Sequence, residues 1–214
     1  MLVGERMTSP ALTIGPEMGV QDALALMHRD HVRRFPVVDS RGNLVGIISE
    51  KDLLDATPSD ATTLSVWEIN YLLSKLTVEK IMTKNVITIT KDTPLEEAAR
   101  IMADKKIGGL PVVEGTKVVG IVTETDIFKL FTEILGARVH GIRLTVQVVD
   151  EPGGLAKLTG AISGTGANII SLTTFQSSTT GTGVITVKVN GVDEASLKKA
   201  IEPVIKKVVD IRTV

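Results

Sequence analysis

The sequence predicts an α/β (α+β) protein in two parts: a duplicated β-α-β-β-α unit, then a separate β-α-β-β-α-β domain. The chain matches itself when it is shifted by 75 residues, which indicates an internal repeat. After Gly136 the hydrophobic period changes, which indicates a different domain. Aromatic residues make up only 3% of the 214 residues, so Val, Ile, Leu and Ala must build the cores. That composition suits helices packed on sheets.

The internal repeat covers the first two thirds of the chain. The run Phe35–Asp39 aligns with Leu110–Glu114 at an offset of 75. One residue is then lost in a turn, and Gly46–Leu53 aligns with Gly120–Ile127 at an offset of 74. So many matches in phase indicate a duplicated unit. Because a half of roughly 60 residues buries little surface by itself, we expect the two halves to pack through their sheets about a pseudo-two-fold axis.

Each copy of the repeat contains the same predicted elements. A short extended segment, Ala11–Ile14 or Val86–Thr90, precedes a helix with apolar residues at helical spacing. Pro94 fits the first turn of the second of these helices. Two apolar strands joined by a turn follow, and a closing helix ends each copy. The predicted positions are strands Pro36–Val38 and Leu44–Ile48 with a helix from near Asp52 in the first copy, and a closing helix from near Asp126 to a C-cap at Gly136 in the second.

The segment between the copies, about residues 57–76, is predicted to form one helix with a buried stripe. Ser65–Glu68 has the pattern of a capping box, and an apolar series at helical spacing follows as far as Leu76. Trp67 and Tyr71, the single Trp and the single Tyr of the chain, lie in this helix. We expect them to pack in the core.

The repeated pattern resembles a pair of CBS domains, also called a Bateman module. In both copies a Pro-hydrophobic-hydrophobic strand is followed by Gly-hydrophobic-hydrophobic-(Ser/Thr)-x-x-Asp-hydrophobic. The resemblance covers about residues 1–136, with repeat one at about 1–56 and repeat two at about 77–136. It implies a sensor whose regulatory ligand is AMP, ADP, ATP, NAD or S-adenosylmethionine, with no required cofactor.

The residues of the two copies could themselves hold a nucleotide. Asp52 and Asp126 each follow a strand at the start of a helix, where a carboxylate can accept hydrogen bonds from both ribose hydroxyls. Ser49 and Thr123 precede them, where free backbone N–H groups favour phosphate. The stretch before each Pro could line a slot for adenine. The candidate residues, which the resemblance also implies, are Val32, Arg33, Arg34, Phe35, Pro36, Ser49 and Asp52 in the first copy and Ile107, Gly108, Gly109, Leu110, Pro111, Thr123 and Asp126 in the second.

An alternative for these motifs is a purely structural one. Ser-x-x-Asp and Thr-x-x-Asp are also helix N-cap patterns, and a duplicated cap is still a cap. The two clefts also differ in charge and size. Arg33 and Arg34 could pair with a polyphosphate, whereas Gly108 and Gly109 leave room and allow close approach of the backbone. We therefore expect at least one occupied site and do not require two.

The last seventy residues predict the ferredoxin-like order β-α-β-β-α-β. Ile142, Leu144, Val146 and Val148 alternate with polar residues, as in a strand with one buried face. A polar loop is expected at Gln176–Gly183. The predicted elements are strand Gly141–Val149, a helix from Leu155 to near Gly164, strands Asn168–Leu172 and Val184–Val189, a helix from Asp193 to Lys207, and strand Val208–Val214.

The run Asp150-x-Pro-Gly-Gly-Leu-Ala-x-Leu158, followed by Gly166-Ala-Asn-Ile169, resembles an ACT domain over about residues 140–214. The resemblance implies that an amino acid or a related small effector binds at a dimer interface where strands pair. Asp150 could accept hydrogen bonds from an ammonium group, and the N–H groups at the following helix N-terminus could bind a carboxylate. Alternatively, Asp150 caps this helix and Pro152 lies in its first turn. The candidate effector-binding residues are Asp150, Gly153, Gly154, Leu155, Asn168 and Ile169.

The bulk composition argues against several classes of protein. A net charge of −1 without a basic face argues against nucleic-acid binding. The absence of cysteine excludes disulfides and cysteine-bound zinc, and no apolar run approaches the roughly 20 residues of a membrane-spanning helix. The first ten residues contain no apolar stretch like that of a signal peptide, so a cytoplasmic location is expected.

Catalytic and metal-binding residues are not expected either. His28 and His31 lie three residues apart on a predicted helix, but no third ligand joins them. No arrangement of residues offers a nucleophile, a base and oxyanion donors together. The sequence therefore predicts a protein that is not an enzyme.

The combination of a CBS pair with an ACT domain resembles the acetoin-utilisation B-type regulatory proteins. This resemblance implies a cytoplasmic homodimer, and a bare edge strand in the second domain would favour dimerisation. The expected function is non-catalytic regulation by an adenosyl ligand in the CBS clefts and an amino acid or similar effector at the ACT dimer interface. Occupancy would pass through the segment near Leu135–Gly141. The alternative is a scaffold or assembly protein with vestigial ligand sites.

Overall fold

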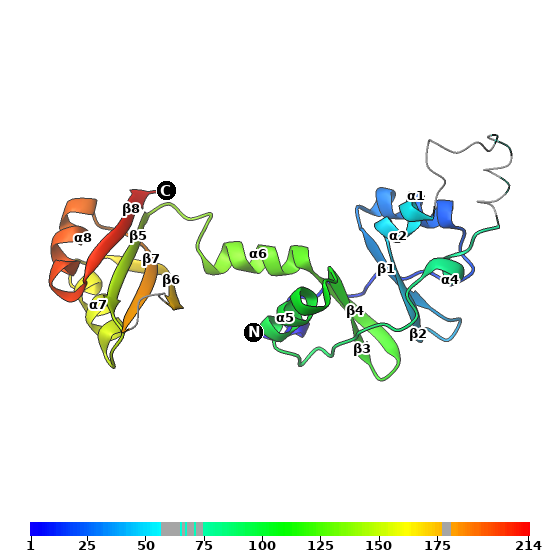
Figure 1. The fold of residues 1–214 in the computed structure, drawn as a ribbon, viewed down its shortest axis with the longest axis horizontal. Helices are drawn as coiled ribbons and strands as arrows, with labels where there is room; N and C mark the ends of the chain where they lie inside the picture. The colour runs from blue at the N-terminus through cyan, green and yellow to red at the C-terminus, as the bar shows by residue number, and fades with distance from the viewer. Residues whose placement is uncertain (57–64, 66, 68–70, 72–74, 177–180) are drawn as a thin grey trace. The chain divides into compact units, whose positions relative to one another are not determined.

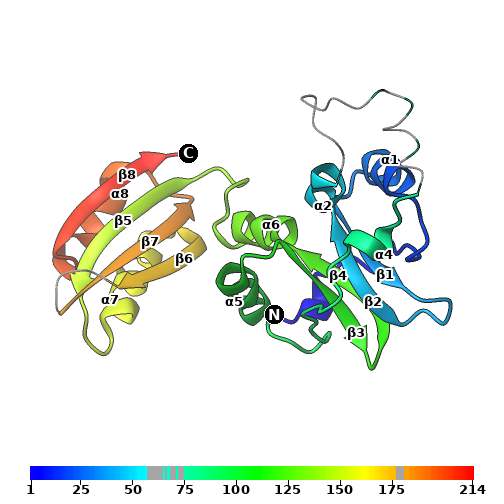
Figure 2. The same cartoon turned by 45° about the vertical axis from the view of Figure 1, so that its right-hand side comes forward.

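The chain divides into two compact units, Met1–Ile127 and Phe128–Val214 (Figures 1 and 2). The first unit ends within a helix, whereas the sequence analysis placed the end of the duplicated part at Gly136. No helix in the described ranges has the length and apolar character needed to cross a membrane. The computed structural model describes residues 1–56, 65, 67, 71, 75–176 and 181–214.

Residues 1–134 contain two copies of a helix, an antiparallel strand pair and a second helix, as predicted. The extended segments predicted at the start of each copy are shorter than expected, because they form single parallel bridges, Ile14 to Val37 and Ile89 to Val112. The elements are η1 (Val3–Glu5), α1 (Val20–Asp30), β1 (Arg34–Val38), β2 (Leu44–Ser49) and α2 (Glu50–Asp55), then α4 (Val78–Ile81), α5 (Leu95–Lys105), β3 (Gly109–Glu114), β4 (Lys117–Thr123) and α6 (Glu124–Ile134).

The helices α1 and α5 end in the same way. Their C-caps, His31 and Lys106, both adopt the left-handed conformation, with φ of 53° and 54°. Few residues other than glycine take this conformation, so its recurrence at the two equivalent positions supports the duplication. Pro94 is the N-cap of α5 and lies just before the first turn in which it was predicted.

The two copies exchange their leading segments. The backbone N–H and C=O of Thr8 pair with those of Ile121 in β4, at 2.9 and 3.0 Å. Thr83, the equivalent residue of the second copy, makes the same two bonds with Ile47 in β2, both at 2.9 Å. Each copy is therefore completed by a segment that belongs, in sequence, to the other copy.

Two glycines make the exchanged contacts possible. A Cβ atom on Gly46 would collide with the side chain of Met82, and one on Gly120 would collide with Met7. Met7 and Met82 are equivalent residues, and so are the two glycines. The repeated residues thus make the same contact crosswise, which agrees with the predicted two-fold relation of the halves.

The aromatic residues of the connecting segment do not join the core, which corrects the prediction. Trp67 is 85% exposed and Tyr71 is 59% exposed. On a helix these two positions share a face opposite to the apolar stripe that ends at Leu76, so they cannot be buried with it. Lys75 covers the Tyr71 ring, with its Nζ 4.4 Å from the ring centroid. The rest of the predicted capping box and stripe lies outside the described residues.

The second unit has the predicted order β-α-β-β-α-β around one antiparallel sheet. The strands lie in the order β6-β7-β5-β8. Helix α8 stops at Ile201, whereas the prediction extended it to Lys207. Pro203 explains the earlier end, because proline and the residue before it disfavour a helix. The elements are β5 (Ile142–Val149), α7 (Gly154–Ser163), β6 (Asn168–Gln176), β7 (Thr182–Asn190), α8 (Glu194–Ile201), η2 (Glu202–Val204) and β8 (Lys207–Thr213).

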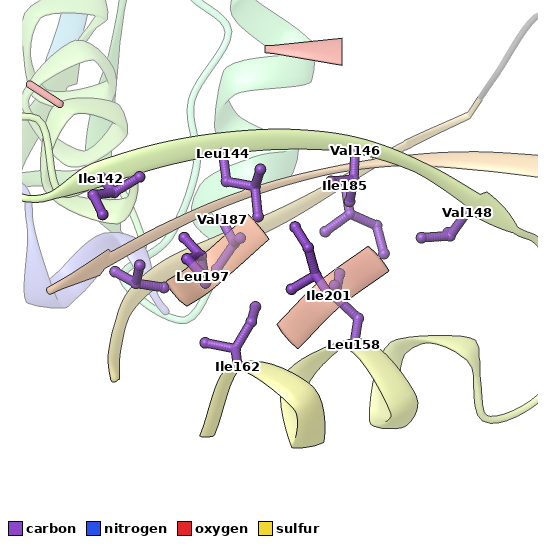
Figure 3. Close-up of a cluster of buried hydrophobic side chains, with 11 residues drawn as sticks. Ile142, Leu144, Val146, Val148, Leu158, Ile162, Ile185, Val187, Leu197 and Ile201 are labelled. Atoms are coloured by element: carbon purple, nitrogen blue, oxygen red, sulfur yellow. The ribbon is translucent and has the colours of Figure 1, made fainter. Parts of the chain in front are cut away.

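One face of this sheet forms the core of the unit (Figure 3). The four residues predicted to alternate along β5 are all buried. Leu158 and Ile162 of α7 and Leu197 and Ile201 of α8 pack against them and are fully buried. Burial of each such side chain contributes roughly 1.5–3 kcal/mol, so this layer is the main source of stability of the unit.

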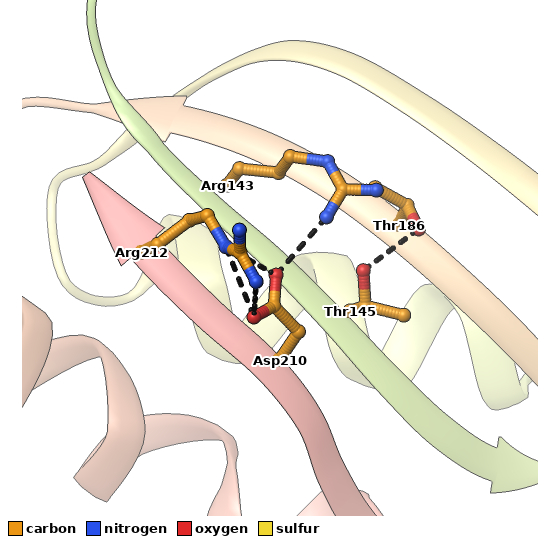
Figure 4. Close-up of polar contacts among 5 residues, drawn as sticks. All are labelled: Arg143, Thr145, Thr186, Asp210 and Arg212. Atoms are coloured by element: carbon orange, nitrogen blue, oxygen red, sulfur yellow. Dashed lines mark hydrogen bonds and ion pairs between the residues drawn. The ribbon is translucent and has the colours of Figure 1, made fainter. Parts of the chain in front are cut away.

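The other face of the sheet is polar (Figure 4). Asp210 of β8 accepts hydrogen bonds from Arg212 at 3.0 Å and from Arg143 of β5 at 3.1 Å. These guanidinium groups, Arg212 above all, hold the pKa of the Asp210 carboxyl below its usual value. Thr145 and Thr186 share a hydrogen bond of 2.9 Å between β5 and β7. The second unit is therefore a two-layer domain with one face of its sheet covered by helices.

Candidate functional site

The Ser49-x-x-Asp52 motif forms a capping box at the start of α2. The backbone N–H and the hydroxyl of Ser49 donate to Oδ2 of Asp52 at 2.8 and 2.6 Å. The N–H of Asp52 donates back to the Ser49 Oγ at 3.3 Å. Both bonds to the carboxylate use Oδ2, and within the described part of the chain Oδ1 of Asp52 accepts none. One oxygen serves the cap, and the other is available to a ligand.

Thr123 and Asp126 repeat this arrangement at the start of α6. The N–H and the hydroxyl of Thr123 donate to Oδ2 of Asp126 at 2.9 and 2.8 Å. The cap and the ligand contact, which the sequence left as alternatives, are thus compatible in both copies because they use different oxygens.

The backbone of α2 does not provide the phosphate site that we expected from its N-terminus. The helix is only six residues long. Its N–H groups at Glu50 and Asp52 already donate to the Arg33 carbonyl at 2.9 Å and to Ser49. A phosphate at this end of the cleft would therefore depend on side chains.

A cavity of about 450 Å³ lies beside the first of these two motifs. It brings together residues of both copies, including seven of the fourteen candidates from the sequence. The lining residues are Arg33, Arg34, Ile47, Ser49, Glu50, Lys51, Asp52, Thr83, Asn85, Val86, Ile87, Lys106, Ile107, Gly108 and Gly109.

The other seven candidates do not line this cavity. Thr123 and Asp126 form the second motif. Phe35 and Leu110 are fully buried in the core, so their side chains cannot line an adenine slot, which corrects that expectation. The physical reason is strand alternation: the preceding residues, Arg34 and Gly109, face the cavity, so Phe35 and Leu110 face inward. Pro36 and Pro111 are buried with them, and Val32 packs against the core of the first copy.

The site residues predicted from the sequence did not include the segment that begins the second copy. Thr83, Asn85, Val86 and Ile87 line the cavity although they lie far in sequence from Ser49. The crosswise pairing of Thr83 with β2 brings them there, and a copy taken alone does not reveal that pairing. Ile87 in this segment is a large apolar residue that is 38% exposed in the structure.

Arg34 extends from the first copy to the second. Its Cδ lies 3.3 Å from the place that a Cβ would take on Gly109, and its Cζ lies 2.7 Å from the corresponding place on Gly108. The Glu124 carboxylate approaches the same place on Gly108 to 2.7 Å. Burial lowers the pKa of the Arg34 guanidinium from its ordinary value, and the charges of Glu124 and Asp52 oppose this shift.

A second cavity, of about 430 Å³, lies in the second unit at the end of β5. Asp150, Gly154 and Leu155 line it together with Phe175 of β6, which is 56% exposed. Asp150 is exposed and, within the described residues, its carboxylate makes no hydrogen bond. Three of the six predicted effector-binding residues therefore meet at one cavity.

The structural alternative for this motif is wrong. Helix α7 begins at Gly154 with Gly153 as its N-cap, and no side chain caps it. Pro152 therefore precedes the helix, and Asp150 does not cap it. Gly153 has a φ of 86°, which only glycine adopts readily, so the Gly-Gly pair sets the turn into α7.

Asn168 and Ile169 lie at the opposite end of the sheet from this cavity. In the register of β6 and β7, Asn168 is opposite Asn190. The other end of β7 starts at Thr182, opposite Val149, which directly precedes Asp150. Ile169 packs against the core. Within one chain these two candidates are therefore not brought to the same ligand site as Asp150, which corrects the expectation.

Comparison with known proteins identifies both parts of the chain. The CBS domain family matches residues 3–59 and 78–133, and the TTHA0829-like ACT domain family matches residues 140–212. A crystal structure of the CBS domain pair of protein MJ0100 in complex with 5-methylthioadenosine and S-adenosyl-L-methionine is 34% identical. It covers 65% of this chain and 98% of that chain, with a TM-score of 0.53.

Two further solved structures are similar. The protein CBSX2 in complex with AMP is 32% identical over 62% of this chain and 97% of that chain, with a TM-score of 0.51. An acetoin utilization protein, AcuB, from Vibrio cholerae is 30% identical over 64% of this chain and 95% of that chain, with a TM-score of 0.54. The predicted resemblance to acetoin-utilisation proteins is confirmed in the CBS part.

Several curated relatives are much longer than the region they share with this chain. At 33–34% identity, the chain spans 23%, 47% and 31% of the length of three of them. The first of these carries an enzyme name. The matches to the duplicated part extend over more than half of the sequence. The chain therefore belongs to the CBS-domain family, with two CBS domains followed by an ACT domain.

Proposed function

We propose that this protein is a non-catalytic regulator that binds an adenosyl ligand in the cavity beside Ser49 and Asp52. The observation that carries the proposal is the free Oδ1 of Asp52 at a cavity built from both CBS copies. A carboxylate held by its other oxygen is a fixed acceptor for the two ribose hydroxyls. Ile107–Gly109 supplies a wall of small and apolar residues, against which an adenine ring can lie.

The relatives support the choice of ligand class. The CBS pair of MJ0100 was crystallised with 5-methylthioadenosine and S-adenosyl-L-methionine, and CBSX2 with AMP. These ligands share adenosine and differ at the 5′ position. The shared part matches what Asp52 and the apolar lining at Ile107 can recognise in this chain, so adenosine is the common element of the proposal.

The ACT domain is proposed to bind a second, smaller ligand. The exposed carboxylate of Asp150 can accept hydrogen bonds from an ammonium group, as an amino acid requires. Leu155 and Phe175 are partly exposed at the same cavity and can contact an apolar side chain. An amino acid or a similar zwitterion is therefore the proposed effector.

The proposed assembly is a homodimer, and the proposed route of signalling is helix α6. In one chain the edge strands β6 and β8 each pair on one side only, which leaves edges that a second copy can extend. Helix α6 starts at the Thr123–Asp126 cap. The carbonyls that follow its end accept hydrogen bonds from the ACT sheet, Leu135 from Ser171 at 3.1 Å and Gly136 from Lys188 at 3.0 Å.

A melting-temperature screen tests the proposed function. The panel contains AMP, ADP, ATP, NAD, S-adenosylmethionine and 5-methylthioadenosine, each with and without a mixture of amino acids. A ligand present at a hundredfold excess over its Kd adds about 2.7 kcal/mol to the free energy of unfolding, so we expect a clear rise in Tm for at least one adenosyl compound. No rise with any of them, for folded protein, would contradict the proposal and favour a scaffold role.

A further inference from the structure

Three cationic side chains of the CBS cavity make no close polar contact with the described part of the chain. Arg33, Arg34 and Lys106 all line the cavity. Within the described residues, none of the three side chains makes a hydrogen bond or an ion pair. Two come from the first copy and one from the second, so the duplication itself gathers them. The Glu124 carboxylate lies near the Arg34 guanidinium without forming an ion pair with it, so the positive charge of the three side chains can still act on a ligand.

The other charges of the cavity are already engaged. Lys51 forms an ion pair with Asp55, and the Glu50 carboxylate lies 3.1 Å from the His28 ring nitrogen. Asp52 shares its charge with the Ser49 donors through Oδ2. An adenosine in this cavity would therefore meet a surplus of positive charge.

Gly108 allows the Arg34 guanidinium to occupy its place. A Cβ on Gly108 would collide with the Nη2 of Arg34 and would lie 2.7 Å from its Cζ. The backbone of Gly108 does not have a positive φ, so any residue could adopt it without backbone strain. Glycine at position 108 therefore leaves space for the Arg34 guanidinium, and a larger residue would displace that group.

We propose that the cavity selects adenosine compounds that carry a 5′-phosphate, such as AMP or ATP, over those whose 5′ group is uncharged or cationic. Asp52 receives the ribose, and Arg34, Arg33 and Lys106 receive the phosphate. Arginine binds phosphate oxygens through two parallel N–H donors and lysine binds as a point charge. The sulfonium of S-adenosylmethionine would instead face three cations and be repelled. This inference rests on the proposed function, because it names the ligand class of the same site.

Isothermal titration with AMP and 5-methylthioadenosine tests the inference, because the two compounds share adenosine and differ in the 5′ group. We expect the wild-type chain to bind AMP at least about tenfold more tightly, the effect of one charge-assisted hydrogen bond. Because salt screens exposed charges, the preference should shrink between about 0.05 and 0.5 M salt. A titration with S-adenosylmethionine should give the weakest binding of the three.

Matched variants locate the phosphate contact. Arg34→Gln and Lys106→Gln should each weaken AMP about tenfold and leave 5-methylthioadenosine unchanged. Lys105→Gln removes the same charge from the neighbouring exposed residue, which does not line the cavity, and should leave both affinities unchanged. Melting curves of every variant check that each one is folded.

The possible outcomes separate this inference from the proposed function. If wild-type chain binds 5-methylthioadenosine or S-adenosylmethionine as tightly as AMP, the selection for phosphate is wrong and the adenosyl site stands. If Arg34→Gln weakens both compounds equally, or if Lys105→Gln weakens AMP as much as Lys106→Gln, the assigned phosphate contacts are wrong. If folded protein binds no adenosine compound, the proposed function fails and this inference fails with it.

Discussion

The two CBS copies carry the same capping motif in different surroundings. Ser49 and Asp52 stand beside a cavity of about 450 Å³. Thr123 and Asp126 make the same bonds within 0.2 Å, but Arg34 crosses from the first copy toward their side of the fold. The residue equivalent to Arg34 in the second copy is Gly109, which sends no side chain back.

The helices that follow the two motifs also differ. α2 has six residues and ends at Asp55, whereas α6 has eleven and leads to carbonyls held by the ACT sheet. The two copies therefore share the cap and differ in the residues and helices around it. On this basis we propose that the first copy binds the ligand and that the second transmits its occupancy.

The sharpest test of this comparison replaces each motif carboxylate in turn. Asp52→Ala removes the proposed ribose acceptor, which makes two charge-assisted hydrogen bonds, so adenosyl affinity should fall roughly a hundredfold. Asp126→Ala removes the same cap from the second copy and should leave affinity within about twofold. Both variants should lose about 1 kcal/mol of unfolding free energy. Titration and urea unfolding measure the two effects, and an equal loss of affinity in both variants would show that the copies do not differ.

The link between α6 and the ACT sheet predicts the next largest effect. Gly136 has a φ of 60°, and a Cβ there would lie 2.7 Å from Cγ2 of Ile170. Gly136→Ala should therefore cost about 2–4 kcal/mol, from backbone strain and overpacking together.

Gly115→Ala is the matched control for Gly136→Ala. Gly115 has nearly the same φ, 61°, but no atom lies within 4 Å of its Cβ position. The Gly115→Ala variant should lose only the unfolding free energy that backbone strain costs, about 1–2 kcal/mol. Equal losses of unfolding free energy in the two variants would show that the contact with Ile170 adds no cost.

Substitution of the two glycines at the crosswise contacts should cost nearly the same unfolding free energy, with a small difference between the copies. A Cβ on Gly46 meets only the flexible Met82 side chain, whereas one on Gly120 also lies 3.0 Å from the Thr8 carbonyl oxygen. Overpacking costs typically about 1–3 kcal/mol, and we expect Gly120→Ala to fall above Gly46→Ala in this range. Thermal unfolding of both variants decides the order, and a larger loss for Gly46→Ala would contradict the described contacts.

The hairpin turn of the first copy predicts the smallest effect on stability. Asp39 accepts hydrogen bonds from the N–H groups of Asn43 and Arg41 at 2.8 and 2.9 Å, and these bonds lower its pKa. A carboxyl with a lowered pKa stabilises the fold above its ordinary value of 3.8, and this contribution is lost as pH falls through the folded pKa. Acid unfolding of Asp39→Asn should therefore be less steep below about pH 4 than that of wild type. Identical acid-unfolding profiles of the variant and the wild type would show that the Asp39 carboxylate does not contribute to stability.

Much of the fold could be predicted because it depends on local patterns in the sequence. The repeat, the alternation along β5 and the helix periods depend on neighbouring residues, and each of them predicted the correct element. The seven candidate residues that line the CBS cavity lie next to caps and strand starts, which local patterns also mark.

What the sequence could not supply were contacts between distant segments. The crosswise pairing of Thr83 places Asn85–Ile87 at the cavity, and no local pattern encodes that exchange. The separation of Asn168 from Asp150 follows from strand register, which needs the assembled sheet. Trp67 was placed in the core by its chemistry, although its helical position faces away from the apolar stripe.

A crystal structure of the chain grown with AMP tests the central claim most directly. We expect one nucleotide per chain, with its ribose hydroxyls on Oδ1 of Asp52, its base against Ile107 and its phosphate at Arg34 and Lys106. A nucleotide bound at Asp126, or a cavity beside Asp52 that stays empty at saturating AMP, would contradict the claim that the first copy is the binding one.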